Sequence, residues 1–367
     1  MTLERQILVW AVALAALGYL LYLLGGAVAP FAAGIALGYL LDPVVRRMQG
    51  VGLSRLVASL IILIVFILVA TLVLLIAAPA LATQFASFAQ KLPGYAMRLQ
   101  ALVVEEGNAL LDRYGGEWRA SGWMISGDQI QKSVGDFVSQ GAQWLLNFLR
   151  SLVSGGAAIF SFLSFLIITP VVAFYILVDW NKMVATIDGW LPLQHRDALR
   201  AIATEVNHAL AGFIRGQSLV CLFLGLWYGI GLTLVGLDFG FLIGVIAGVL
   251  SFIPYVGSLT ALVLSIGVSL VQGWPSLTLF LSALAIVLVG QFLEGYVVSP
   301  KLVGGSIGLH PVWLMFALFA FGGLFGFTGL LIAVPAAAAL GVLVRHLIGL
   351  YLKSPLYRGG TGPQETS

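Results

Sequence analysis

The chain has 367 residues, of which 60% are hydrophobic and only 9% are charged. Soluble domains carry about 25% charged residues, so this composition cannot cover a compact water-soluble body, and we predict an all-α polytopic integral membrane protein. The formal net charge of +3 is small, and we interpret it as a guide to membrane topology rather than as a nucleic-acid interface. The single cysteine, Cys221, excludes an intrachain disulfide.

Apolar runs of about 18 residues or more mark the segments that can span a bilayer. The N-terminal run has the outline of a signal peptide, but Pro30 directly follows Ala-Val-Ala, which makes a poor cleavage site, so we expect a retained helix. A shorter segment at 28–41 continues it as a hairpin. The uninterrupted long segments are predicted at about 7–25, 54–78, 151–178, 213–236 and 276–298.

Two further apolar runs, 240–272 and 311–345, are too long for one simple crossing and are interrupted, at FIPYVG and at GGLFGFTG. If each run crosses the membrane once, Lys301 lies outside the cell; if each folds into a re-entrant hairpin, Lys301 lies in the cytoplasm. We prefer the hairpins, because each half of 240–272 has about 14 residues and about 20 are needed to span.

The distribution of basic residues predicts the orientation, because cytoplasmic loops are enriched in lysine and arginine. The loop 42–55 carries three arginines against Asp42, and the C-terminal end is also basic, so we expect this loop and both termini in the cytoplasm. In 79–150 six bases balance six acids, as in a translocated domain, and a helical apolar face runs from Ile130 to Phe148. The predicted division is 1–78 for the N-terminal membrane helices, 79–150 for a small helical extracytoplasmic domain, 151–178 for a membrane helix, 179–212 for a cytoplasmic amphipathic segment whose helix begins after Pro192, 213–350 for the C-terminal membrane core and 351–367 for a cytoplasmic tail.

Sequence signatures of enzymes and metal sites are absent. The four histidines are scattered and never pair at metal-ligand spacing. Neither a nucleotide-binding loop nor a nucleophile elbow is present. We therefore expect a protein that is not an enzyme and that uses no cofactor or metal.

Polar residues inside apolar sequence are the informative ones. Glu294 interrupts a predicted spanning helix, where a carboxylate must face protein or water, and it is equally explained as a proton or cation site and as a structural group paired with Lys301. Asp42, beside Pro43, is better explained by the end of a helix than by function. Arg215 fits snorkelling to lipid headgroups, or an anion partner inside a cavity.

The interruption at FIPYVG raises the question of what a proline does inside an apolar run. A proline there frees backbone groups that lipid cannot satisfy, so such a break needs protein or water around it. We interpret Pro254, Tyr255, Gly257 and Ser258 as a hinge or re-entrant tip on a transport path, because paired broken helices mark binding sites in transporters. Glycines at helical spacing, including Gly34/Gly38, Gly225/Gly229 and Gly240/Gly244/Gly248, are explained by close helix packing.

Several motifs together make the chain similar to a known family. These are GIALGYLLDPVVRRM, FYILVD at 174–179, FIRGQ at 213–217, FIPYVGS and EGYVVSPKLVGGSIGLHPVWLMFALFAFGGLFGFTGLLIAVP. The chain resembles the AI-2E family of transporters, the autoinducer-2 exporter family of permeases. The resemblance implies about eight membrane segments, a bacterial inner membrane location and a homo-oligomer, with a pentamer suggested. Together with the residues read from the sequence, it makes the candidate path or gate residues Pro254, Tyr255, Gly257, Ser258, Gln291, Glu294, Pro300, His310, Pro311, Gly326 and Gly329, with Asp42 and Arg215 as secondary candidates.

Three functions remain open at this point. The first is a facilitator or secondary transporter that exports a small polar metabolite similar to autoinducer-2, because sparse charge in the spans suits a neutral solute. The second is a Na⁺(Li⁺)/H⁺ antiporter that relies on Glu294. The third is a membrane scaffold that binds partners through 79–150. The expected partners are thus membrane lipids, a small polar substrate or cations and protons, and further copies of the chain.

Overall fold

The computed structural model describes residues 25–119, 136, 140, 143, 156–303, 308–354 and 357. The expected segment at 7–25 lies outside this part except for its last residue, as do the last ten residues and most of the expected apolar face between Ile130 and Phe148. Within the described part every regular element is a helix, and six helices are long and apolar enough to cross a membrane. The all-α polytopic membrane class is therefore confirmed.

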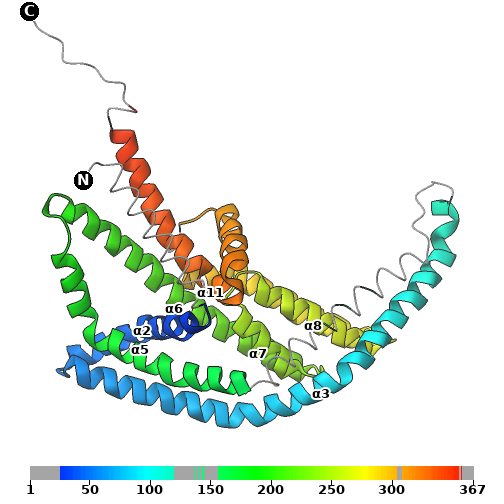
Figure 1. Ribbon diagram of the computed structural model, residues 1–367. Coiled ribbons are helices and arrows are strands. Elements are labelled where there is room, and N and C mark those ends of the chain that lie inside the picture. The colour runs from blue at the N-terminus through cyan, green and yellow to red at the C-terminus, as the bar shows by residue number, and fades with distance from the viewer. Residues whose placement is uncertain are drawn as a thin grey trace, which may run out of the picture. The chain divides into compact units, whose positions relative to one another are not determined.

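Figure 1 shows the described helices in chain order. Their bounds are α2 Gly25–Gly50, α3 Arg55–Arg119, α5 Gly156–Gly189, the short η1 Leu193–His195, α6 Arg196–Leu234, α7 Gly240–Leu250, α8 Val256–Gly273, α9 Thr278–Leu293, the π-helical turn η2 Glu294–Val298, α10 Ser299–Leu302 and α11 Pro311–Lys353. The chain forms two compact units. Unit 1 contains 1–67, 164–219 and 298–367, and unit 2 contains 68–163 and 220–297.

Unit 1 is built around the packing of α2, α3 and α5. Val45, Ala58 and Ala173 are fully buried in its apolar core. Glycine allows α2 and α5 to approach closely, because a Cβ built on Gly34 would lie 2.6 Å from the Cβ of Val172. The packing role predicted for the Gly34/Gly38 pair is thus confirmed.

Unit 2 also has a close helix contact formed by glycines, between α6 and α7, and we call such a contact a glycine seam. A Cβ built on Gly244 would overlap the backbone N and Cα of Gly229, and one built on Gly248 would overlap the Cα of Gly225. The two helices therefore touch backbone to backbone, a distance that only glycine permits. The predicted close packing through these glycines is confirmed.

The helix end predicted at Asp42 is wrong. Helix α2 does not stop at Asp42 but continues through Pro43 to Gly50, since Asp42 forms an ion pair one turn on, with Arg46 at 2.7 Å, and the proline removes only one backbone hydrogen bond. Helix α3 contains the apolar run expected at 54–78 and continues past it through Pro79. The division at 78/79 into membrane helices and an outer domain stays a prediction.

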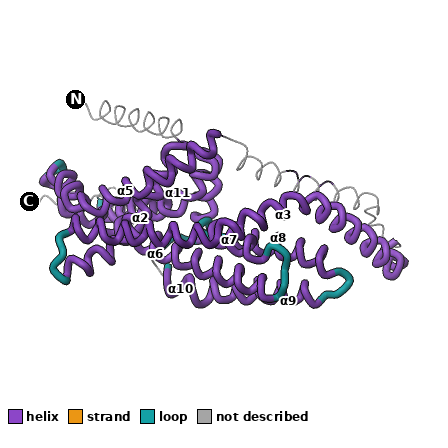
Figure 2. The backbone as a smooth tube through the Cα atoms, turned by 90° about the horizontal axis from the view of Figure 1, so that it is seen from below, coloured by secondary structure: helices purple, strands orange, loops and turns teal. Residues whose placement is uncertain are grey.

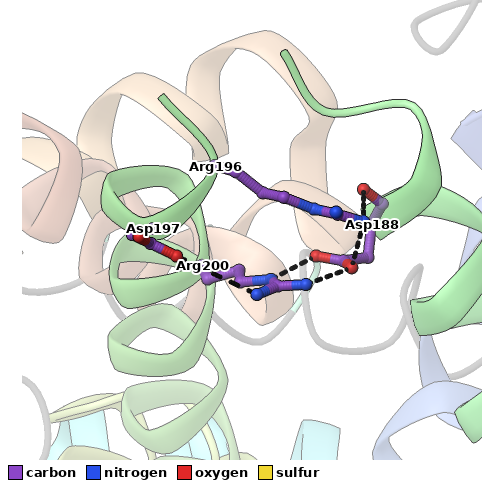
Figure 3. A network of polar contacts seen from close by, with 4 residues as sticks. All are labelled: Asp188, Arg196, Asp197 and Arg200. Atoms are coloured by element: carbon purple, nitrogen blue, oxygen red, sulfur yellow. Dashed lines mark hydrogen bonds and ion pairs between the residues drawn. The ribbon is translucent and has the colours of Figure 1, made fainter. Parts of the chain in front are cut away.

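Ion pairs connect the end of α5 to the start of α6 (Figure 3). The carboxylate of Asp188, at the end of α5, accepts hydrogen bonds from Arg200 at 2.6 Å on each oxygen and from Arg196 at 2.8 Å. Helical structure resumes with η1 directly after Pro192, which confirms the predicted start. Helix α6 then runs unbroken from this corner to Leu234.

Both predicted interruptions exist. Residues 251–255 form turns between α7 and α8, and these two helices pack against each other. Within α11, Gly326 has a non-helical backbone with φ 59° and ψ −139°. A Cβ built on Gly322 would lie 2.8 Å from Leu330 Cδ2, whereas residues eight apart in a straight helix are separated by roughly 12 Å. The chain therefore folds back at both breaks, as the hairpin interpretation requires.

Candidate functional site

One polar group in unit 2 lies among apolar helical residues and consists of Tyr228, Gln291 and Glu294, which we call the polar cluster. The Tyr228 side chain is fully buried, and its hydroxyl accepts a hydrogen bond from Gln291 Nε2 at 3.2 Å. Gly290 makes room for it, since a Cβ there would lie 2.5 Å from the tyrosine ring. A second tie between α6 and α9, from Trp227 Nε1 to the Ile286 carbonyl at 3.0 Å, fixes the two helices beside this pair.

Glu294 is the first residue of the π-helical turn η2 and is partly buried. Pro300 lacks the amide hydrogen that a regular helix would donate to Tyr296, and this proline accounts for the change of helical pitch. Turns of this kind occur often at functional sites. Among the described residues Glu294 has no ion-pair partner, Lys301 included. Its carboxylate is therefore available to a cation, a proton or a hydroxylated solute.

The break between α7 and α8 satisfies its own backbone. Phe252 N–H donates to the Val249 carbonyl at 3.2 Å, and Ile253 N–H donates to the Leu250 carbonyl at 3.0 Å. Gly257 is required for close packing, because a Cβ there would meet the Ser251 hydroxyl and backbone. The proline break thus leaves few backbone groups in need of water.

Tyr255 and Ser258 differ in what they can offer a solute. The Ser258 hydroxyl donates to the Tyr255 carbonyl at 3.1 Å. This hydrogen bond stabilises the start of α8, and the hydroxyl proton is therefore already used within the protein. Tyr255 has a left-handed backbone with φ 69°, uncommon for a residue with a side chain, and its side chain is 56% exposed. Of the two predicted hydroxyl-bearing residues, Tyr255 is the more exposed one.

The turn and the polar cluster lie at the same end of unit 2. Helices α8 and α9 pack side by side and are joined by four residues, 274–277 (Figure 2). They must therefore run antiparallel, which places the start of α8 with Tyr255 beside the end of α9 with Gln291 and Glu294. The structure thus brings the first six candidates of the predicted path, from Pro254 to Glu294, to one end of one unit.

The remaining candidates belong to unit 1, and the structure gives them local roles. His310 caps α11, its Nδ1 accepting from Val312 N–H at 3.3 Å, and Pro311 occupies the first turn. A Cβ built on Gly329 would overlap the Phe321 carbonyl, so this glycine, with Gly326, is needed for the fold-back. Pro300 is the second residue of the short helix α10. In the part of the chain that the structure describes, none of these five residues is joined to a polar cluster of its own.

Asp42 and Arg215, the two secondary candidates, line one pocket in unit 1 together with Tyr39, Trp180 and Asn207. Asp42 is held by Arg46 at 2.7 Å and by Arg55 at 3.2 Å, so it is structurally satisfied there. No group of three or more His, Cys, Asp or Glu side chains in the described ranges could hold a metal ion.

Sequence reasoning missed Tyr228 and Gly290, as well as Tyr39, Trp180 and Asn207. Tyr228 carries a polar tip inside the apolar run LGLWYGIGL, where an intramembrane polar group is a functional hypothesis in its own right. Gly225 and Gly229, on either side of it, favoured an interpretation of this stretch as a helix-packing face. Asn207 could have been found as the polar residue between Val206 and the apolar stripe that continues to Phe213.

Comparison with known proteins identifies the class. The family model for "AI-2E family transporter" matches residues 8–349. This chain therefore belongs to the AI-2E transporter family, a class of multi-pass membrane permeases and transport proteins, and a membrane transport function follows at that level.

Individual relatives cover most of the chain. The "Putative transport protein YrrI" of Bacillus subtilis (strain 168) is 29% identical over 87% of this chain and 86% of its own length. The "Putative permease PerM" of Escherichia coli (strain K12) is 28% identical over 89% of this chain and 88% of its own length. These relatives agree with the family in naming transport, and their names specify no substrate.

Proposed function

We propose that this protein exports a small polar metabolite, similar to autoinducer-2, along a path lined by the polar cluster, as a facilitator or a secondary transporter. The observation that carries the proposal is the grouping of a phenol, an amide and a carboxylate beside the α7–α8 break. Membrane helices bury such groups rarely, and those that do so mark solute or ion pathways. Together the three side chains offer both donors and acceptors with a single charge, which suits a neutral, hydroxyl-rich solute.

A second candidate function, Na⁺(Li⁺)/H⁺ antiport, is favoured by one specific observation. Glu294 has no ion-pair partner among the described residues, and antiport needs a carboxylate that can exchange a proton for a cation. The same residue therefore serves both candidates, and a measurement of both fluxes separates them.

The setting of the proposed function rests on the sequence and on the family. We propose a bacterial inner-membrane protein with both termini in the cytoplasm, assembled as a homo-oligomer, in line with the pentamer that the resemblance suggests, and acting without catalysis or cofactor. The scaffold alternative depends on 79–150, of which the structure describes only three residues beyond Arg119, and it stays a prediction.

The test is flux through the purified protein in liposomes. Release of labelled autoinducer-2 and proton movement driven by a sodium gradient are measured side by side on the same preparation. Autoinducer-2 release that does not depend on ion gradients supports a facilitator. Sodium-driven proton movement without autoinducer-2 release supports the antiporter. If neither flux exceeds that of protein-free liposomes, the proposed function is wrong for these solutes and the scaffold alternative gains weight.

Water access to the α7–α8 break is a separate prediction. In a Cys221→Ala background, Tyr255→Cys should react with a charged, membrane-impermeant thiol reagent at least about tenfold faster than Ile253→Cys, because reaction requires an accessible thiolate. The two positions differ strongly in exposure, since Tyr255 is 56% exposed and Ile253 is 1% exposed. Equal inertness of both cysteines would show that lipid, not a water-filled path, surrounds the break.

A further inference from the structure

A pocket in unit 1 lies where α2, α5 and α6 meet. It is lined by Tyr39, Asp42, Arg46, Trp180, Asn207 and Arg215, among others, and has about 350 Å³ of empty space, part of it open to solvent. This pocket does not belong to the polar cluster of unit 2. The charge and the hydrogen-bonding groups of its lining side chains determine which ligand it can bind.

The charge of the pocket is positive. Asp42 is its only acidic group, and this carboxylate is already shared by Arg46 at 2.7 Å and Arg55 at 3.2 Å. Arg55 is further fixed by a hydrogen bond from its Nε to the Leu177 carbonyl at 2.6 Å. Arg215 lines the same space and has no ion-pair partner among the described residues. Two guanidinium groups thus neutralise the carboxylate of Asp42, and the positive charge of Arg215 is left over in the pocket.

The hydrogen-bonding groups that remain are donors. The Asn207 Oδ1 accepts from the Tyr39 hydroxyl at 3.0 Å. The NH₂ of the same amide is a donor, and no partner for it is seen among the described residues. The indole of Trp180 packs edge-on against Tyr39, with ring centroids 5.7 Å apart, and its N–H can only donate. A pocket that offers hydrogen-bond donors and excess positive charge fits an anion with several acceptor oxygens, of which a phosphate group is the best match.

Exposed apolar strips lead away from the pocket along two of its helices. Ile35 and Phe31, one and two turns before Tyr39 on α2, are 39% and 50% exposed. Leu219, one turn after Arg215 on α6, is 47% exposed. Residues four apart lie on one helix face, so each strip continues from a residue that lines the pocket. Acyl chains would cover such strips, whereas a free phosphate would leave them bare.

We propose that this pocket binds the phosphate of an anionic phospholipid headgroup, with Arg215, Asn207 and Trp180 as the recognising side chains. Basic pockets between membrane helices are suited to such headgroups, and Trp and Tyr are enriched at the membrane interface. The acyl chains lie along Ile35 and Phe31 on one side and along Leu219 on the other.

The experiment measures lipid binding to the purified full-length protein in detergent, by native mass spectrometry and by the apparent unfolding temperature. Phosphatidylglycerol should raise the unfolding temperature, and zwitterionic phosphatidylethanolamine should not. Arg215→Gln should weaken phosphatidylglycerol binding about tenfold, the effect of losing one charge-assisted hydrogen bond. Arg47→Gln is the matched control, because Arg47 is exposed on the same basic stretch but does not line the pocket.

Each other outcome overturns the proposal. Equal weakening by Arg47→Gln would show attraction to the basic surface in general, and equal binding of both lipids would show that charge is not recognised. Displacement of phosphatidylglycerol by inorganic phosphate would assign the site to free phosphate instead. If Arg215→Gln does not fold, Asn207→Asp serves in its place: it keeps the acceptor for Tyr39, removes the donor and adds a negative charge, so unchanged lipid binding in that variant would also refute the site.

Discussion

Replacing Glu294 with glutamine is expected to lower solute flux in liposomes by about tenfold or more. Glutamine preserves the size of the side chain but removes the charge, and a hydrogen bond to a charged group contributes roughly 1.5–3 kcal/mol. The half-buried carboxylate has no ion pair of its own among the described residues, so the substitution breaks no salt bridge that holds the fold. Sodium-driven proton movement, if present in the wild type, should disappear altogether.

The control for this variant is Glu205→Gln, which makes the same chemical change in an exposed ion pair with Arg345 at 3.0 Å. Exposed pairs contribute only about 0–1 kcal/mol, so flux should stay near the wild-type value. Full activity of the Glu294 variant in both assays would remove the residue from the path and leave it a structural role in the π-helical turn. A loss of proton movement with solute flux intact would favour the antiporter.

Replacing Gly244 with alanine is expected to destabilise the protein by about 2 kcal/mol or more, the range for overpacking a close contact. The added Cβ would meet the backbone N and Cα of Gly229 and the carbonyl carbon of Tyr228. Backbone atoms cannot rotate away as a flexible side chain can, so α6 and α7 must separate. That movement would also displace Tyr228 from Gln291, and we expect transport to fall together with stability.

Gly267→Ala provides the matched comparison for Gly244→Ala. A Cβ at position 267 in α8 would have nothing within 4 Å, and alanine is a better helix former than glycine by roughly 1 kcal/mol. Thermal or denaturant unfolding in detergent should therefore show a destabilised Gly244 variant and an unchanged or more stable Gly267 variant. Similar behaviour of the two variants would mean that the α6–α7 contact does not limit stability.

The glycine seams and both helix breaks could be predicted because their causes are local. Glycines four apart place small side chains on one helix face, and this spacing is visible in the sequence at 225/229 and at 240/244/248. The break at 251–255 contains Pro254, and the fold-back at Gly326 lies in a stretch with four glycines. In both cases a residue that a regular helix tolerates poorly marks the position.

Where α2 ends could not be predicted from Pro43 alone. Pro43 and Pro79 each lie inside a continuing helix, as does Pro170 in α5. One proline removes one hydrogen bond, and neighbouring packing or an ion pair such as Asp42 with Arg46 can outweigh this loss. In these three helices, therefore, a proline does not mark a helix end.

The sequence by itself determined that this is a helical membrane protein, where its helices break and which faces pack closely, because hydropathy, glycine spacing and proline act over a few neighbouring residues. Only the tertiary structure decided which polar side chains meet. Tyr228 and Gln291 are 63 positions apart, and Tyr39 and Asn207 are 168 apart. Such pairs depend on how whole helices pack and turn about their axes, and a helix of mostly apolar residues does not encode in its own pattern which of its few polar groups faces a partner.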